Sequence, residues 1–85
     1  MQIEIKVTSS YGALSRGRQS ARKGTGSDVQ WADKDARGTM IINSPGIWKL
    51  HCSDGFKRTA TATLQVDDDG AWEMTGDVKR FDVLE

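Results

Sequence analysis

The chain has 85 residues, of which 36% are hydrophobic and 28% charged, and its twelve Lys and Arg are balanced by twelve Asp and Glu. We expect residues 1–85 to form a single domain, and a domain of this size buries roughly 60% of the surface of its unfolded chain, which disfavours a deep active-site cavity beside the core. The zero net charge gives no global reason to expect a polyanionic partner.

The charges are unevenly spread along the chain. Residues 1–23 carry five bases and one acid, whereas the rest carries seven bases and eleven acids. Within SRGRQSARKG (15–24), four bases occur with no acid, namely Arg16, Arg18, Arg22 and Lys23. This asymmetry is the electrostatic signal that a functional hypothesis has to explain.

The compartment follows from cysteine usage and hydropathy. Cys52 is the single cysteine, which is typical of a reducing cytosol. No apolar run is long enough for a membrane helix, and MQIEIKV lacks the basic start and apolar stretch of a secretory signal. We therefore expect a cytoplasmic protein without membrane contact, and we interpret Leu84-Glu85 as residues left by a cloning site.

The first predicted element is a half-buried strand over residues 1–8, because Ile3, Ile5 and Val7 alternate with polar residues. Residues 9–37 then contain few large apolar side chains, and we interpret them as a long basic loop between the first two strands. Within it, Ser27 and Gln30 form a capping-box pattern, Val29, Ala32 and Ala36 recur at a helical spacing, and Gly38 can close a C-terminus. This pattern predicts a short helix over 28–37. The alternative is a short edge strand with Val29 and Trp31 on one face.

The second half of the chain predicts a meander. Turn residues, including Ser44-Pro45-Gly46 and Asp54-Gly55, separate apolar-rich segments at 39–43, 47–53, 58–66 and 71–81. With the first strand, these segments predict an all-β fold with one short helix at most. The architecture we expect is a small five-stranded antiparallel meander, partly barrel-like, with the long basic loop between strands one and two.

The register of the last hairpin follows from the requirement for a continuous core face. Opposed residues share a face, so a three-residue loop at 68–70 pairs Val66 with Trp72 and Leu64 with Met74, and it places Gly70 in the left-handed conformation. Trp48 and Trp72 then lie on the core face. The apolar phase changes after Gly76, which predicts a bulge or the end of a strand there.

The strand at 39–43 raises the question of a second apolar face. In the meander, Ile41 shares the face of Trp48 and Leu50, while three apolar residues point the other way, namely Met40, Ile42 and Ile47. Either segment 28–37 or a partner covers that second face, and a second copy of the chain is one such partner.

The sequence contains no recognisable catalytic, metal-binding or phosphate-binding motif. His51 and Cys52 are strand neighbours, so they point to opposite faces and cannot form a dyad; we expect Cys52 in the core and His51 in solvent. The acidic turn at 67–70 lacks the bidentate Glu of a calcium loop, and RKGTGSD lacks the phosphate-loop pattern. We predict no catalytic residues, no metal, no cofactor and no enzymatic activity.

The candidate contact residues are the four clustered bases, with Tyr11 before them and Trp31 after them. Arginine suits phosphates or acidic side chains because its guanidinium makes bidentate contacts. Trp31 is a binding anchor if it is exposed and a structural residue if it caps the sheet. The competing interpretation of the bases is a loop that its charges keep in solution.

Three functional hypotheses follow. The leading one is a small binding protein that acts by protein–protein interaction, as a phage or mobile-element inhibitor or accessory factor that occludes a larger protein or ribonucleoprotein. The second is a nucleic-acid module with the same bases on phosphates, which the neutral charge and the want of an aromatic platform near the arginines disfavour. The third is a subunit that self-assembles through sheet edges or through the second apolar face.

Overall fold

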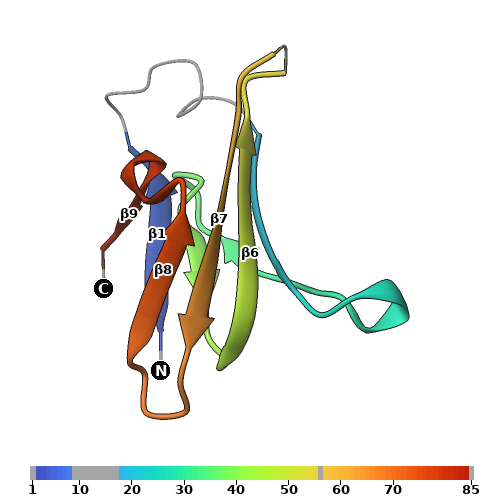
Figure 1. Ribbon diagram of the computed structural model, residues 1–85, viewed down its shortest axis with the longest axis vertical. Helices are drawn as coiled ribbons and strands as arrows, with labels where there is room; N and C mark the ends of the chain where they lie inside the picture. Colours follow the sequence, from blue (N-terminus) through green and yellow to red (C-terminus); the bar gives the residue numbers. More distant parts are fainter. Residues whose placement is uncertain (1, 9–17, 56, 85) are drawn as a thin grey trace.

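The computed structural model describes residues 2–8, 18–55 and 57–84, and in these residues two antiparallel sheets pack against each other (Figure 1). The smaller sheet has the strand order β4-β5-β1-β9 and the larger sheet has the order β3-β2-β6-β7-β8. The strands are β1 (Ile3–Val7), β2 (Arg18–Lys23), β3 (Gln30–Trp31), β4 (Asp33–Lys34), β5 (Met40–Ile42), β6 (Gly46–Ser53), β7 (Thr59–Val66), β8 (Trp72–Gly76) and β9 (Phe81–Val83). The described residues also contain two short 3-10 turns, η2 (Gly26–Asp28) and η3 (Val78–Arg80).

The prediction of an all-β fold is confirmed, but the five-stranded, partly barrel-like meander is wrong. Of the strands that the structure describes, only β6, β7 and β8 form a meander, and the two sheets do not close into a barrel. Among the described residues, no helix has the length and apolar character needed to cross a membrane.

The core lies between the two sheets and follows from strand alternation. Ile3, Ile5 and Val7 of β1 are buried as predicted, and they share one core with the inward residues of the larger sheet. On β6, Trp48, Leu50 and Cys52 are buried, whereas the residues between them are exposed. Burying each such apolar side chain contributes about 1.5–3 kcal/mol, so this alternation fixes which face of each sheet is left for solvent.

The strand at 39–43 packs with the opposite face to the one predicted. Met40 and Ile42 are fully buried, and Ile41 is only half-buried. The reason is that β5 pairs with β1 and not with β6, because the chain passes from one sheet to the other at residues 43–45. The second apolar face is therefore core, and of its three predicted members only Ile47 is exposed, at 55%.

The predicted long basic loop contains strands. Residues 18–23 form β2, which pairs with β6 along its whole length although Ala21 is its only buried apolar residue. Tyr11 and Arg16 lie outside the described residues. The signal for a strand here is weak in the sequence because backbone pairing to β6 and β3, more than apolar burial, holds β2 in place.

The predicted helix over 28–37 is wrong, and the edge-strand alternative is correct for Gln30–Trp31. β3 forms the edge of the larger sheet, and after Ala32 the chain continues as β4 in the smaller sheet. The amide of Ala32 donates to the carbonyl of Ala21 at 2.9 Å, a cross-strand bond that a helix could not make. The alanines of the helical pattern offered too little apolar area to favour a helix against this pairing.

One turn type closes two hairpins. In DARGT (35–39) and DDDGA (67–71), the first amide donates to the carbonyl of the fifth residue, and the glycine amide donates back to the first carbonyl. Gly38 and Gly70 have positive φ angles of 82° and 90°, which favour glycine. The backbone amide of Thr39, and more weakly that of Arg37, holds the pKa of the Asp35 carboxyl below its ordinary value.

The predicted register of the last hairpin is confirmed, since Val66 pairs with Trp72 and Leu64 with Met74. Trp72 is nevertheless 39% exposed, because β8 is the edge of its sheet. β8 ends at Gly76 as predicted, with φ +94° and its backbone close to Ala62. The chain then turns through η3 into β9, which joins the smaller sheet beside β1.

Candidate binding surface

The larger sheet buries one face and exposes the other. On the exposed face, one residue from each strand lies in a single cross-strand row, because each is the register partner of the next. In order across the sheet, the row is Trp31, Arg22, Lys49, Thr63 and Thr75. An exposed aromatic ring, two cations and two hydroxyls are therefore aligned, although they come from distant parts of the chain.

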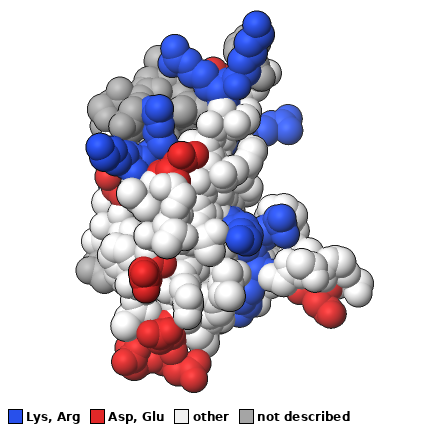
Figure 2. Space-filling view, viewed as in Figure 1, with Lys and Arg blue, Asp and Glu red and all other residues white. Residues whose placement is uncertain are grey.

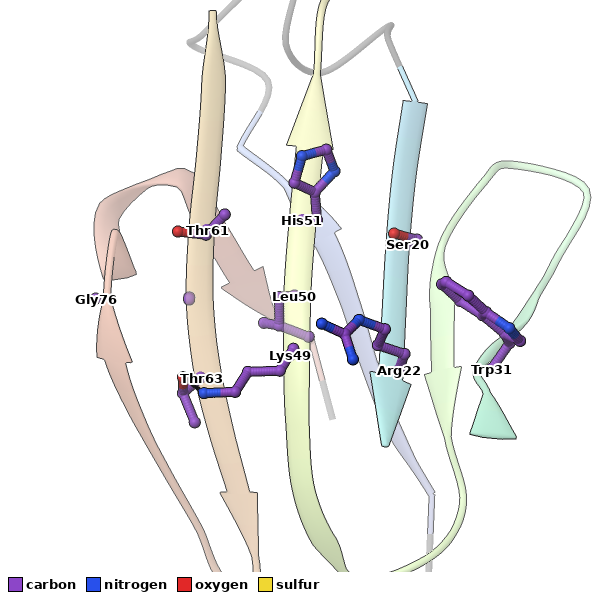
Figure 3. Close-up of a pocket in the computed structure, with 10 residues that line it drawn as sticks. Ser20, Arg22, Trp31, Lys49, Leu50, His51, Thr61, Thr63 and Gly76 are labelled. Atoms are coloured by element: carbon purple, nitrogen blue, oxygen red, sulfur yellow. Dashed lines mark hydrogen bonds between the residues drawn. The ribbon is translucent and has the colours of Figure 1, made fainter. Parts of the chain in front are cut away.

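A depression of about 470 Å³ lies on this row and on the next, in which Ser20, His51 and Thr61 are aligned. Figure 3 shows the Arg22 side chain reaching over the space between β2 and β6, and the Lys49 side chain running toward Thr63. Trp31 stands on the far side of β2, on the edge strand β3. Cation, hydroxyl and aromatic groups thus surround one shallow space.

A second depression continues from the first toward Arg18 and Gly55, and the two share Ser20, Trp31 and His51. We call them together the β2–β6 trough. Its lining residues are Arg18, Gln19, Ser20, Arg22, Trp31, Lys34, Lys49, Leu50, His51, Ser53, Gly55, Thr61, Ala62, Thr63 and Gly76. Four of these described residues are Lys or Arg and none is Asp or Glu, although the whole chain carries equal numbers of acids and bases.

The basic groups of the trough are accessible. Arg18 and Arg22 are exposed, and Arg22 Nη1 donates a long hydrogen bond of 3.4 Å to the carbonyl of Gly24, which uses one of its five N–H donors. Lys49 Nζ donates to Thr63 Oγ1 at 3.1 Å on the surface. Trp31 is 60% exposed, the largest exposed fraction among the large apolar residues described. These groups can contact a ligand without dismantling the fold.

Lys23 is adjacent to Arg22 but belongs to the opposite side of β2. Its Nζ donates to Ser44 Oγ and to the carbonyl of Pro45, both at 2.8 Å, and lies 5.3 Å from the ring centroid of Trp48. Trp48 Nε1 donates to the carbonyl of the same Ser44 at 3.0 Å. The Lys23 side chain therefore fastens the crossing between the sheets.

The sequence-predicted contact residues are thus divided. Arg18, Arg22 and Trp31 meet in the trough, and Lys23 is engaged within the chain. Sequence reasoning missed Lys34, Lys49 and His51 as members of the same surface. For Lys49 and His51 a signal existed, since alternation along 47–53 places both opposite the core residues of that strand.

The expected orientation of His51 and Cys52 is confirmed. Cys52 is fully buried and His51 is exposed. Burial raises the pKa of the Cys52 thiol above its ordinary value, which keeps the thiol protonated and unreactive. Among the described residues, no three His, Cys, Asp or Glu side chains lie close enough together to hold a metal ion.

The densest cluster of acidic side chains lies outside the trough, toward β8 and the turn before it. Three aspartates occupy the turn between β7 and β8, and Glu73 follows on β8. Figure 2 shows the largest red patch at the lower end of the molecule, where that turn lies, and blue beside β6 and around the upper end, where the β6–β7 turn projects, with smaller red patches among the upper blue groups and on the segment that projects to the right. Lys57 and Arg58 belong to this upper turn. The densest acidic cluster and the trough therefore occupy different parts of the larger sheet.

Comparison of the chain with protein-family models, with curated proteins and with solved structures finds no match. The function of the trough is therefore argued from the charge, exposure and alignment of its own residues.

Proposed function

We propose that this protein is a small binding protein without chemical activity that covers a negatively charged surface of a larger macromolecule with the β2–β6 trough. The observation that carries the proposal is that four bases and the exposed Trp31 line the trough with no acid among the lining residues. Clustered charge of one sign steers an oppositely charged partner, and Arg and Trp are the residues most enriched where binding energy concentrates.

The mode of action that this surface supports is occlusion. The trough crosses exposed strand faces of the larger sheet, whereas sites for small molecules enclose most of the ligand surface. A larger partner, such as a protein or ribonucleoprotein, can cover the whole row from Trp31 to Lys49. An inhibitor or accessory factor of this size works by blocking that partner's surface.

Chromatography on immobilised heparin tests the proposal, because heparin is a dense polyanion that needs no knowledge of the natural partner. The informative variant is Arg22→Ala/Lys49→Ala. The matched control is Lys6→Ala/Lys79→Ala, which removes the same two charges from exposed residues that do not line the trough. We expect the wild-type protein and the control to elute together, and the trough variant to elute at lower salt.

Two results would contradict the proposal. The first is a wild-type protein that is not retained at low salt, because a trough of four bases would then attract no polyanion. The second is an equal shift for both double variants, which would assign retention to net charge and not to the trough.

A further inference from the structure

We infer that the covered macromolecule is a single-stranded nucleic acid, with a base stacked on Trp31 and phosphates on Arg22, Lys49 and Arg18. This inference rests on the proposed function, because it names the partner of the same trough. Two features beyond charge carry it, which are the position of an exposed indole on the strand next to that of Arg22, on the same face of the sheet, and the spacing of the cations along β2.

Trp31 supplies the stacking surface. It is the cross-strand partner of Arg22, and neighbouring strands lie about 4.8 Å apart, so the two residues leave the same face of the sheet from adjacent strands; the Arg22 side chain extends toward β6 and leaves the indole uncovered (Figure 3). It also lines both depressions of the trough. The two residues are nine positions apart in the sequence, and it is the pairing of β2 with β3 that brings them to adjacent strands. The objection that the arginines lack a nearby aromatic ring therefore does not hold for the folded chain.

The cations are spaced for a backbone that follows the strands. Arg22 and Lys49 are cross-strand partners at one end of the trough, and Arg18 lies on the same face four residues earlier, about 13 Å away at the usual rise of a strand. Ser20, His51 and Thr61 lie between these ends and present groups that can hydrogen-bond sugars and base edges. A chain of several phosphates can therefore meet a cation at each end.

The charges around the trough also favour one direction for a bound polyanion. Toward β8, Glu73 is the cross-strand partner of Gln65, and Asp77 Oδ2 accepts a hydrogen bond of 3.0 Å from the backbone amide of Thr61. Carboxylates therefore border the trough on that side. Toward the β6–β7 turn, beyond the pair of Arg18 with Ser53, Lys57 and Arg58 add two positive charges and Asp54 one negative charge. A polyanion is therefore favoured along β2 and β6 and disfavoured across the sheet to β8.

Stacking distinguishes a single strand from a duplex. A base can lie on Trp31 only when it is free of its own neighbours, and aromatic stacking of unpaired bases is the common device of proteins that bind single strands without sequence preference. A duplex would offer phosphates to the arginines but no base face to the indole. The inference thus predicts weaker binding of duplex than of single strand at equal length.

The test is a fluorescence-anisotropy titration of a labelled oligothymidine of about 12 nucleotides, with a duplex of equal length beside it, at several salt concentrations. We expect the single strand to bind more tightly than the duplex. Three phosphate contacts predict a slope of log affinity against log salt of about −2. In Arg22→Ala/Lys49→Ala the slope should fall to about −0.7, and in Lys6→Ala/Lys79→Ala it should not change.

Two substitutions of Trp31 isolate stacking from charge. Trp31→Ala should weaken binding of the single strand by roughly 5- to 150-fold, the range for loss of one stacked base. Trp31→Phe keeps a ring and should retain most of the affinity. Because the side chain is exposed at a sheet edge, both variants should keep the unfolding midpoint of the wild-type protein, which is checked in parallel.

The inference is overturned by absence of oligonucleotide binding at low salt, by equal affinity for duplex and single strand, or by wild-type affinity in Trp31→Ala. If heparin retention depends on Arg22 and Lys49 while the oligonucleotide does not bind, the proposed function stands and an acidic protein becomes the partner. If heparin retention fails as well, both proposals fall.

Discussion

The two faces of the larger sheet are built from the same strands and have opposite characters. On β6, Leu50 and Cys52 point into the core, while Lys49 and His51 lie on the exposed face beside them. On β2, Ala21 is buried and Arg22 is exposed. One step along a strand thus separates residues that hold the fold from residues that can contact a partner. Single substitutions at adjacent positions should separate stability from binding.

The largest effect is expected on the inner face. Leu64→Ala removes a fully buried side chain that faces the core from the centre of β7, and we expect a loss of about 2–5 kcal/mol in the free energy of unfolding. Thr63→Ala, its neighbour on the outer face, should change that free energy by less than about 0.5 kcal/mol. Urea unfolding followed by tryptophan fluorescence measures both. Equal losses in the two variants would contradict the separation of the faces.

Alternation made the inner face predictable from the sequence. The strands at 1–8, 47–53 and 58–66 have clear period-two patterns, and their buried residues are those that the patterns indicated. β2 could not be predicted in this way, because its one buried apolar residue is Ala21. Alternation does not indicate which sheet a strand joins. Because β5 lies in the smaller sheet and β6 in the larger sheet, the face of β5 that packs in the core is the opposite of the expected one.

The two related turns show how local context misleads. DDDGA lies between two clear strands and was correctly predicted as a hairpin turn, whereas DARGT makes the same backbone hydrogen bonds in a polar segment. There the glycine resembled the end of a helix, because the preceding alanines matched a helical spacing. Only the pairing of β4 with β5 distinguishes the two interpretations.

The outer face was predictable in part. The clustering of bases and the position of Trp31 in the sequence identified three residues of the trough, Arg18, Arg22 and Trp31. Lys49 and His51 could not be joined to it, because they meet Arg22 and Ser20 only through the pairing of β2 with β6. A surface made by register between distant segments has no continuous signature in the sequence.

A smaller effect is expected from the adjacent residues 51 and 52. Cys52→Ser places a hydroxyl in the apolar core, where it lacks the solvation that it has in water, and we expect a loss of about 1–3 kcal/mol in the free energy of unfolding. His51→Ser should leave stability nearly unchanged and weaken binding of the oligonucleotide, since it alters only the trough. Urea unfolding and anisotropy titration report the two outcomes. A destabilised His51→Ser variant would show that the outer face contributes to the fold.

The smallest effects are expected at two lysines of the larger sheet. One substitution should lower stability and the other should lower affinity. Lys23→Met keeps the aliphatic stem but removes two hydrogen bonds of 2.8 Å and a cation over Trp48, so we expect a loss of about 1–2 kcal/mol in the free energy of unfolding and unchanged oligonucleotide affinity. Lys49→Met loses one exposed bond to Thr63, so its stability should change by less than about 0.5 kcal/mol while its affinity falls.

These two variants test the difference between the two faces directly, because the substitution and the change in charge are identical at both positions. A loss of affinity in Lys23→Met without a loss of stability would mean that the Lys23 cation contributes to the trough in spite of its bonds to Ser44 and Pro45. Unchanged affinity in Lys49→Met would remove β6 from the binding surface and confine it to β2 and β3. Either result would change which of the two lysines belongs to the binding surface.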